Sequence, residues 1–544
     1  MNIAESVGRA LASVGVDHVF GVVGSGNFHI TNAMVAAGSR FVASRHEAGA
    51  ATMADAYART SGNVTAVSVH QGCGLTNAMT GVAEAAKSRT PLLVLAAEVS
   101  EPRSNFYVDQ DALARAVGAV PRRITAPETA VAEACAAVAT ALYERRTVLL
   151  NLPLHLQSVE VPGAQDATLP PSPAAVIPGD AEVAPLVERL DRAERPVFVA
   201  GRGSRGEGCR EALVNLADRY GALLATSAVA RGLFNGNPWY LDVSGGFSSP
   251  LAAELIRGAD LIVGWGCALN MWTMRHGRLI APEATVVQVD DDSAALGVHR
   301  DVGLGVTGDV LATARRALEA AGPHRDGYRD ADRRERIANQ IRWRDVAFED
   351  TSTADRIDPR SLTIGLDDVL PADRVLGVDS GNFMGYPSMF LSVPDERGFC
   401  FTQSFQSIGL GLATAVGAAL AQPDRLPVAA LGDGGALMSA AELDTVRRLS
   451  LPMVVVVYND DAYGAEVHHF QPGGYPLDTV RFPPTDIAAI ARGYGFDAVT
   501  VRTLKDLDGV AEWVAGDRAR PLLVDAKVVG DQPAWWLEEA FRGH

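Results

Sequence analysis

Short apolar runs alternate along most of the chain with longer stretches that are amphipathic or rich in alanine. Residues 65–69, 426–431 (LPVAAL) and 451–458 (LPMVVVVY) are such runs, with the length and composition of strands buried on both faces of a parallel sheet. Residues 48–58 and 410–420 are rich in good helix formers. The alternation predicts an α/β fold built from doubly wound parallel sheets.

Two segments interrupt this alternation and predict domain boundaries. Residues 159–180 are rich in Pro, Ala and Gly, which is typical of an exposed linker. Residues 322–358 are dense in Arg and Asp, which predicts a solvated helix and a second linker. The chain is therefore expected to form three blocks, over residues 1–158, 180–325 and 358–544.

Composition and charge narrow the class of protein. The chain has 544 residues, 48% of them hydrophobic, and a formal net charge of −17, so nucleic acid and anionic membranes are poor partners. The five cysteines lack metal-ligand spacing, the N-terminal segment has the pattern of an amphipathic helix, and no apolar run is long enough for a membrane span. These features predict a cytoplasmic protein with reduced thiols.

The most informative motif contains two aspartates that follow successive predicted strands. Asp433 lies in the sequence GDGG after the strand at 426–431, and Asp460 lies in NDDAYG after the strand at 451–458. Because ligands bind at the carboxyl ends of strands in an open parallel sheet, these carboxylates are expected to face one ion. Magnesium prefers oxygen ligands and completes its shell with phosphates and water. The pattern therefore predicts a site for Mg²⁺ and a diphosphate.

This arrangement resembles the thiamine diphosphate (ThDP) enzymes of the 2-keto acid decarboxylase and acetolactate synthase superfamily, whose signature is GDG followed by an Asn pair. The separation of 27 residues (460 − 433) matches the family spacing, but the pair here is Asn459-Asp460. The resemblance implies that the metal ligands are the carboxylates of Asp433 and Asp460 and the backbone carbonyl of Ala462. The cofactor-binding residues that it implies in this block are Gly432, Asp433, Gly434, Gly435, Asn459, Asp460, Tyr463 and Gly464.

The GDGG sequence by itself is also typical of a glycine-rich turn in an unrelated α/β protein. The spacing to Asp460 and the matches in the first block favour the ThDP interpretation. A helix is expected after the motif, with Ser439 as its N-cap and Glu442 completing a capping box.

Glu47 is the candidate acid of the first block. It lies in SRHEAGA, between a short strand that ends at Ala43 and the helix predicted at 48–58. The resemblance implies that Glu47 hydrogen-bonds a pyrimidine ring nitrogen of ThDP and acts in general acid-base catalysis. The alternative role of a glutamate at this position is a favourable first-turn interaction with the helix dipole.

A bulky apolar side chain that bends the cofactor is implied at Ile408, in the sequence SFQSIG, with Ser407 beside it in the cofactor-binding segment. A β-branched side chain has few rotamers, which suits a rigid support. The alternative is an ordinary core isoleucine that precedes the helix predicted at 410–420.

Further residues are implied on the substrate side. Ser25 and His70 lie in loops that follow predicted strands, and benzoylformate decarboxylase has Ser and His at the matching places. Glu466 lies three residues after Tyr463, in the register of a catalytic Glu of pyruvate and indolepyruvate decarboxylases. A structural loop histidine and a solvated helix glutamate are the alternative interpretations. The catalytic set that the resemblance implies is Ser25, Glu47, His70 and Glu466.

The middle block contains glycine turns after predicted strands, at residues 201–203 and at Gly266. Some relatives hold FAD or ADP in this block. A dinucleotide fingerprint needs glycines after a strand and an acidic residue about 20 residues further on, and we find no convincing match. We expect a scaffold here and do not expect FAD.

The resemblance covers essentially the whole chain. It implies a pyrimidine-binding domain (1–158), a central domain (180–325) and a diphosphate- and Mg-binding domain (358–544). The implied reaction is ThDP- and Mg-dependent decarboxylation of a 2-keto acid through an enamine intermediate, which is released as an aldehyde or ligated to a second carbonyl. An acetolactate synthase-type carboligase, which is a transferase, is the alternative.

Assembly follows from the same resemblance. The superfamily places its active sites at the subunit interface, so a homodimer or homotetramer is expected in which Glu47 and Asp433 of one site belong to different chains. The partner implied is a small-molecule 2-keto acid. A non-catalytic homologue would be expected to lack Glu47 or Asp433, and both are present.

Overall fold

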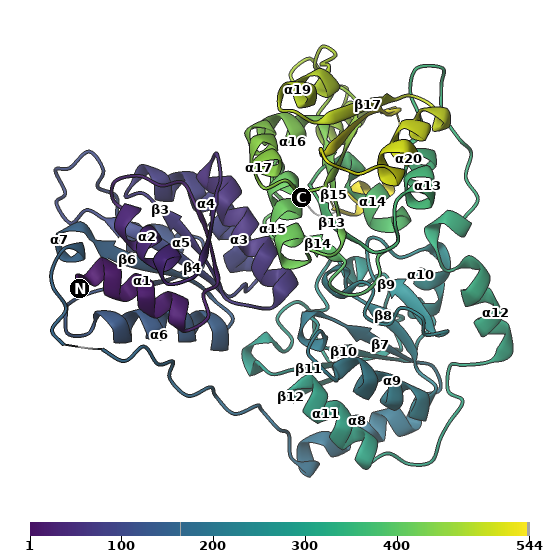
Figure 1. Ribbon diagram of the computed structural model, residues 1–544. Helices are drawn as coiled ribbons and strands as arrows, with labels where there is room; N and C mark the ends of the chain where they lie inside the picture. The colour runs from purple at the N-terminus through teal and green to yellow at the C-terminus, as the bar shows by residue number, and fades with distance from the viewer. Residues whose placement is uncertain (164, 532, 541–544) are drawn as a thin grey trace.

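Three six-stranded parallel sheets, with helices between successive strands, make up the protein. The computed structural model describes residues 1–163, 165–531 and 533–540. In Figure 1 the first block lies at the left in purple and blue, the third block lies at the upper right in green and yellow, and the central block lies below the third in teal. The predicted α/β fold of three doubly wound parallel sheets is confirmed.

The first sheet has the strand order β2-β1-β3-β4-β6-β5. Strands β3, β4 and β6 are buried along their whole length, as expected for apolar runs covered on both faces. The strands are β1 (His18–Gly21), β2 (Arg40–Ala43), β3 (Thr65–Val69), β4 (Leu92–Glu98), β5 (Val120–Arg123) and β6 (Thr147–Pro153). The helices are α1 (Ile3–Ser13), α2 (Phe28–Ala36), α3 (Glu47–Ser61), α4 (Cys73–Lys87), α5 (Gln110–Ala116), α6 (Ala130–Tyr143) and α7 (Leu154–Gln157).

The third sheet has the order β14-β13-β15-β16-β18-β17, which is the order of the first sheet in equivalent strands. Its strands are β13 (Arg374–Val378), β14 (Phe399–Phe401), β15 (Leu426–Gly432), β16 (Val454–Asn459), β17 (Asp497–Val501) and β18 (Leu522–Lys527). Its helices are α13 (Pro359–Val369), α14 (Gly385–Phe390), α15 (Gly411–Ala421), α16 (Asp433–Met438), α17 (Leu443–Arg448), α18 (Gly464–Phe470), α19 (Ile487–Gly493), α20 (Asp508–Ala515) and α21 (Trp535–Ala540). A 3-10 turn, η7 (Ala440–Glu442), joins α16 to α17.

The central sheet has the order β12-β11-β10-β7-β8-β9, so the chain reverses direction across the sheet between β7 and β10. The turns after these two strands pack tightly, because a Cβ atom at Gly201 would lie 2.3 Å from the carbonyl oxygen of Gly266. The strands are β7 (Pro196–Ala200), β8 (Leu223–Thr226), β9 (Tyr240–Val243), β10 (Leu261–Trp265), β11 (Thr285–Asp290) and β12 (Leu304–Thr307). The helices are α8 (Asp180–Arg192), α9 (Cys209–Tyr220), α10 (Pro250–Arg257) and α11 (Val310–Glu319), and α12 (Ala331–Gln340) follows in the connection to the third block.

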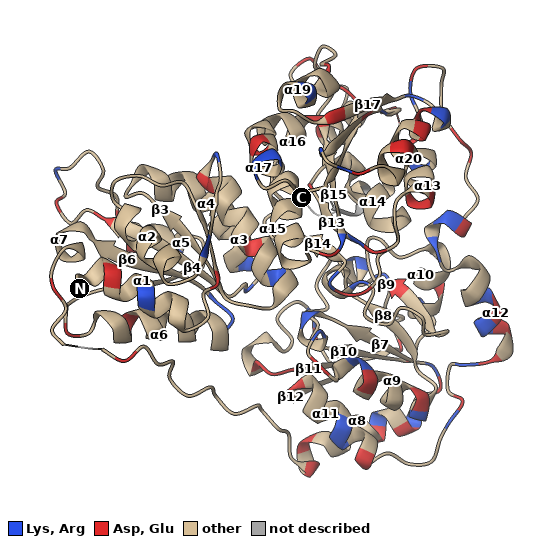
Figure 2. Ribbon diagram, in the orientation of Figure 1, with Lys and Arg blue, Asp and Glu red and all other residues tan. Residues whose placement is uncertain are grey.

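The first and third blocks share one hydrophobic core. Helix α3 packs against α15, and Met53 and Val416 are fully buried in the same cluster. A Cβ atom at Gly417 would lie 2.1 Å from the carbonyl oxygen of Met53, so glycine allows the two helix backbones to approach closely. Figure 2 shows α15 without charged residues, whereas the outer helices α8, α11 and α12 carry many.

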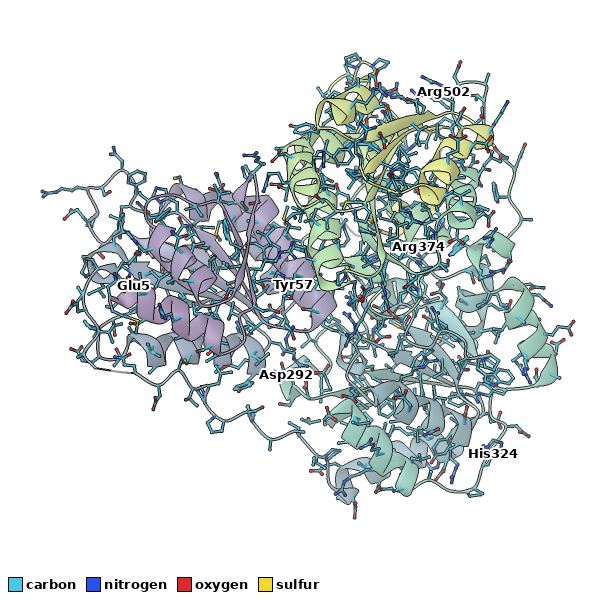
Figure 3. The ribbon with its side chains drawn as sticks, in the orientation of Figure 1. Glu5, Tyr57, Asp292, His324, Arg374 and Arg502 are labelled. Atoms are coloured by element: carbon cyan, nitrogen blue, oxygen red, sulfur yellow. The ribbon has the colours of Figure 1, made fainter. Side chains whose placement is uncertain are left out.

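The central block contacts the first block through ion pairs. Arg89 lies 3.1 Å from Asp292, and Arg145 lies 2.5 Å from Asp291. Figure 3 shows Asp292 at the edge of the central block that faces the first block, and Tyr57 of α3 where the first block meets the third. No helix in the described ranges has the length and apolar character that crossing a bilayer requires.

The predicted capping box at Ser439 and Glu442 is wrong. Helix α16 begins at Asp433 and ends before Ser439, whose hydroxyl donates to the carbonyl of Gly435 at 2.8 Å. Glu442 instead accepts hydrogen bonds from backbone amides of the first block. The Glu442 side chain therefore makes a contact between blocks, whereas the local sequence pattern had predicted that it caps a helix.

Candidate active site

Asp433 and Asp460 come together at the carboxyl ends of the adjacent strands β15 and β16. Burial raises the pKa of both carboxyls above the usual range, and the nearby Asp433 charge raises that of Asp460 further. Two buried carboxylates side by side repel each other, and a divalent cation between them removes that repulsion. The pair therefore fits Mg²⁺, which binds oxygen ligands.

Glycines allow the loops around the pair to pack closely. A Cβ atom at Gly464 would lie 2.4 Å from Asp460 Oδ2, and one at Gly434 would lie 2.5 Å from the Tyr463 ring. Ala462 pairs with Arg481 in an isolated antiparallel bridge. No cluster of three or more His, Cys, Asp or Glu side chains suited to a metal occurs in the described ranges. An ion here would therefore rely on two carboxylates, backbone oxygen and oxygens of the cofactor.

The residues beside Asp460 make other contacts. The Asn459 side chain is buried and donates to Asp525 Oδ1 at 2.9 Å, so it shapes the loop from inside the third block. Asp461 forms an ion pair of 2.5 Å with Arg356. The structure thus leaves Asp460 facing Asp433, while both neighbouring side chains are held elsewhere.

A cavity of about 290 Å³ opens beside Asp460. Arg481 and Phe482 form part of its wall, and Phe482 also packs against the Tyr463 ring with centroids 4.8 Å apart. The lining residues are Arg356, Asp460, Asp461, Ala462, Gly464, Val467, Arg481, Phe482 and Gly530.

Glu47 is the first residue of α3, after the N-cap His46, whose Nδ1 accepts from the Ala48 amide at 3.1 Å. Its carboxylate is half-buried and accepts a hydrogen bond of 3.1 Å from Asn77 Nδ2. Gly74 lies near the carboxylate, because a Cβ atom there would lie 3.5 Å from Oε1. Asn77 is a neighbour that the sequence gave no reason to select.

His70 lies beside Glu47, because Gly74 borders both side chains. The Nδ1 atom of His70 is buried without a hydrogen-bond partner in the described part of the chain, and its ring meets Phe106 edge to face with centroids 5.4 Å apart. Gly24 leaves space for the ring, since a Cβ atom there would lie 2.9 Å from His70 Cγ. Ser25 follows in the same loop and is exposed. Three predicted residues of the first block thus gather at the ends of neighbouring strands.

Ile408 lies half-buried before α15, in a loop fixed by Asp379. Asp379 is fully buried at the end of β13 and accepts from the amides of Gly409 at 3.0 Å and Leu410 at 3.2 Å. Burial raises the pKa of Asp379 to about 6. The Ser407 hydroxyl donates to the Ile408 carbonyl at 3.3 Å. Asp379 was missed in the sequence, although an aspartate directly after a strand is a usable signal.

Glu466 is a half-buried residue of the short helix α18, which follows the Asp460 loop. Its neighbour His468 has a buried Nε2 without a hydrogen-bond partner among the described residues, and burial lowers the pKa of its imidazole. The predicted site residues therefore form two groups, one on the first block and one on the third.

Family models match all three blocks. The N-terminal domain of thiamine pyrophosphate enzymes, another name for ThDP enzymes, matches residues 1–119, the central domain matches 183–317 and the C-terminal domain matches 379–526. The chain belongs to the thiamine pyrophosphate enzymes, in the superfamily of 2-keto acid decarboxylases and acetolactate synthases.

Curated relatives resemble the chain over most of its length. A probable 2-ketoarginine decarboxylase of Pseudomonas aeruginosa is 29% identical over 93% of this chain and 90% of its own. An acetolactate synthase large subunit of Parasynechococcus marenigrum is 28% identical over 90% of this chain and 82% of its own. A sulfoacetaldehyde acetyltransferase of Castellaniella defragrans is 27% identical over 93% of this chain and 89% of its own.

A solved structure supports the fold independently. The ThDP-dependent 4-hydroxybenzoylformate decarboxylase of Rhodococcus jostii superposes with a TM-score of 0.81 at 22% identity, over 98% of this chain and all of that one. The predicted ThDP enzyme family and its fold are thus confirmed.

Proposed function

We propose that the enzyme uses ThDP and Mg²⁺ to decarboxylate a 2-keto acid, and that the product is released as an aldehyde or joined to a second carbonyl. The observation that carries this proposal is the buried pair of Asp433 and Asp460 at adjacent strand ends, in a chain that contains all three ThDP enzyme domains. Such a pair favours a bound cation, and Mg²⁺ commonly completes its shell with phosphate oxygens and water.

Each side chain of the site has a role in this proposal. The carboxylates of Asp433 and Asp460 and the carbonyl of Ala462 hold the metal, and the loops 432–435 and 459–464 hold the diphosphate. Bound ThDP supplies an electron sink for the electrons that CO₂ leaves behind. Ile408 would support the bound cofactor.

Protons are handled by residues of both blocks. Glu47 would share a proton with the pyrimidine ring of bound ThDP, and Asn77 donates a hydrogen bond that orients the carboxylate. His70 and Glu466 deliver or remove a proton near the substrate carbon, and Ser25 contacts the substrate. The buried Nδ1 of His70 has no hydrogen-bond partner among the described residues, so packing against Phe106 and not a hydrogen bond at this nitrogen holds the ring.

We propose the domain division 1–158, 180–325 and 358–544 and a homodimer or homotetramer with shared active sites. Large apolar side chains remain exposed next to both groups of site residues, which supports an interface between subunits there. On the first block they are Val23, Phe28, Phe106 and Tyr107, and on the third block they are Phe405, Leu437, Met438, Phe470, Tyr475 and Phe482.

A carboligase or acyl transferase is the second candidate. It is favoured by the relatives that are named acetolactate synthase and sulfoacetaldehyde acetyltransferase, whose identities of 28% and 27% are close to the 29% of the named decarboxylase. Both candidates share the decarboxylation step when the donor is a 2-keto acid. They differ in whether a proton or a carbonyl carbon reacts next.

The test is incubation of the pure protein with ThDP, Mg²⁺ and a panel of 2-keto acids that includes pyruvate, benzoylformate and 2-ketoarginine, with and without an aldehyde acceptor. We expect CO₂ release from at least one acid, lost on removal of either ThDP or Mg²⁺. The ratio of aldehyde to ligated product then assigns the reaction class. Absence of CO₂ from every acid, or release that survives chelation of the metal, would contradict the proposal.

A further inference from the structure

The first and third blocks contact each other through equivalent elements. In each sheet the edge strand, β2 or β14, leads into a loop and then into a helix, α3 or α15, and these two helices pack together. The loop of the first block ends at Glu47, and the loop of the third block contains Ile408. Each loop therefore lies against the opposite block, immediately beside a residue of the proposed site.

Glu442 of the third block binds the loop of the first block. Its Oε1 accepts from the amides of Arg45 and His46, both at 3.0 Å, and its Oε2 accepts from the Thr445 hydroxyl at 2.6 Å. The side chain is 3% exposed. A Cβ atom at Gly49 would lie 2.5 Å from Oε1, so the helix leaves space for the carboxylate only because residue 49 is glycine. The two amides directly precede Glu47.

Glu84 of the first block makes the equivalent contact with the loop of the third block. Its two carboxylate oxygens accept from the amides of Ser404 at 3.0 Å and Phe405 at 2.5 Å. The side chain is fully buried, and Arg59 donates to it at 2.8 Å. These two amides lie three and four residues before Ile408.

Arginines make a second pair of reciprocal contacts, at the ends of the two edge strands. Arg59 of the first block donates to the carbonyl of Phe401, the last residue of β14, at 3.1 Å. Arg448 of the third block donates to the carbonyl of Ala43, the last residue of β2, at 2.6 Å. Each loop is thus bound at its start by an arginine and further along by a glutamate of the opposite block.

We propose that Glu442 and Glu84 are reciprocal positioning residues, each of which fixes the backbone that presents a site residue of the opposite block, Glu47 for Glu442 and Ile408 for Glu84. The roles of Glu47 and Ile408 rest on the proposed function, whereas the contacts themselves do not. Two adjacent amides held by one buried carboxylate leave the loop little freedom to shift. In the proposed dimer, Glu47 and Ile408 of one chain belong to different sites, so the contacts inside each chain join the geometry of both sites.

The experiment compares Glu442→Ala with Glu442→Gln. Glutamine keeps an oxygen for both amides, and its NH₂ group can donate to the Thr445 hydroxyl, so it preserves the contact, whereas alanine removes it. Arg45→Ala is the matched control, because it removes the side chain that pairs with Asp444 at 2.6 Å and keeps the backbone amide that donates to Glu442. Gly49→Ala is the second disrupting variant, should Glu442→Ala fold poorly.

Hydrogen exchange and kinetics are the two measurements. Glu442→Ala and Gly49→Ala should speed amide exchange in residues 44–48 and leave residues 402–408 unchanged. Glu84→Gln should do the reverse, because the two amides bind different oxygens of Glu84 and glutamine keeps only one of them. With an active substrate, kcat should fall by on the order of 10²-fold in Glu442→Ala, the effect of misplacing a catalytic group by about 1 Å. Glu442→Gln and Arg45→Ala should stay within about threefold of wild type.

Exchange in residues 44–48 that is unchanged in both disrupting variants would overturn the proposal, as would a Glu442→Gln variant as impaired as Glu442→Ala. Exchange is measured without substrate, so it tests the contacts even if no 2-keto acid is decarboxylated. Failure of the proposed function and failure of this inference are therefore distinguishable.

Discussion

The first and third blocks have one strand order but offer different chemistry at their strand ends. The first presents an acid and a histidine, Glu47 and His70, whereas the third presents the buried aspartate pair. The two glutamates that bind the opposite block, Glu442 and Glu84, also differ in their electrostatic surroundings. Burial raises the pKa of Glu442 above its usual value, whereas at Glu84 the effect of burial is more than offset by Arg59 and the two amides, which lower the pKa.

This comparison shows that two domains with the same strand order can present different side chains at equivalent positions. The shared strand order places equivalent loops opposite each other, and the side chains in those loops then set the chemistry.

The largest expected effect is in the first block. Glu47→Gln should lower turnover by about 10² to 10⁴-fold, the range of general acid-base catalysis, while the fold and the affinity for ThDP stay close to wild type. Steady-state kinetics and cofactor titration measure the two quantities. Turnover at the wild-type rate would remove the assignment of Glu47 as the acid.

The second-largest expected effect concerns proton transfer by His70 of the first block and Glu466 of the third block. If the enzyme is mainly a decarboxylase, His70→Ala and Glu466→Gln should each cut aldehyde release by about 10²-fold and leave some ligated product with an added acceptor. His155→Ala, an exposed histidine, is the matched control. Both products are measured for every variant. Full activity in both variants would exclude these residues from the site.

Substitution at the proposed metal site of the third block should have a more moderate effect. Asp460→Ala should raise the Mg²⁺ concentration needed for half-maximal activity by about 10 to 100-fold and weaken ThDP together with it, because the ion bridges protein and diphosphate. Asp460→Asn retains an oxygen ligand and should lose less. Asp461→Asn is the control, since Asp461 pairs with Arg356. An unchanged Mg²⁺ requirement in Asp460→Ala would assign the ligand to another residue.

The smallest effect is the pH dependence of stability, which should have opposite signs at the two inter-block glutamates. Because the folded pKa of Glu442 is raised, its contribution is present below the usual value of 4.5 and is lost as pH rises through the folded pKa. Because that of Glu84 is lowered, its contribution is present above 4.5 and is lost as pH falls through the folded pKa.

Urea unfolding of wild type, Glu442→Gln and Glu84→Gln across pH 4 to 7 measures this difference. The stability that wild type has over Glu442→Gln should decline with rising pH, and that over Glu84→Gln should not. Equal slopes of stability against pH for the two variants would mean that Arg59 does not lower the pKa of Glu84 relative to that of Glu442.

Several elements were readable from short-range patterns. The apolar run of β3 was predicted with its observed limits, and β15 and α15 were predicted within one residue at each end. Buried strands of a parallel sheet are continuous apolar runs, so they can be found from a short stretch of sequence alone. The prediction of a capping box at Ser439 was wrong because the side chain of Glu442 binds backbone amides about 400 residues away in the chain and not the start of its own helix.

The sequence by itself determined the family, the fold class and the candidate Mg²⁺ and ThDP residues, because strand length, glycine turns and the spacing of Asp433 and Asp460 are local properties of the chain. Only the tertiary structure revealed Asp379, Asn77, Glu84 and Glu442 as neighbours of the candidate site. Each of these side chains acts on groups brought to it by the packing of strands and helices, and a hydrogen bond between distant segments has no signature in either segment alone. The metal-ligand pattern is therefore visible in the sequence, whereas the contacts that position it are decided by how the first and third blocks pack.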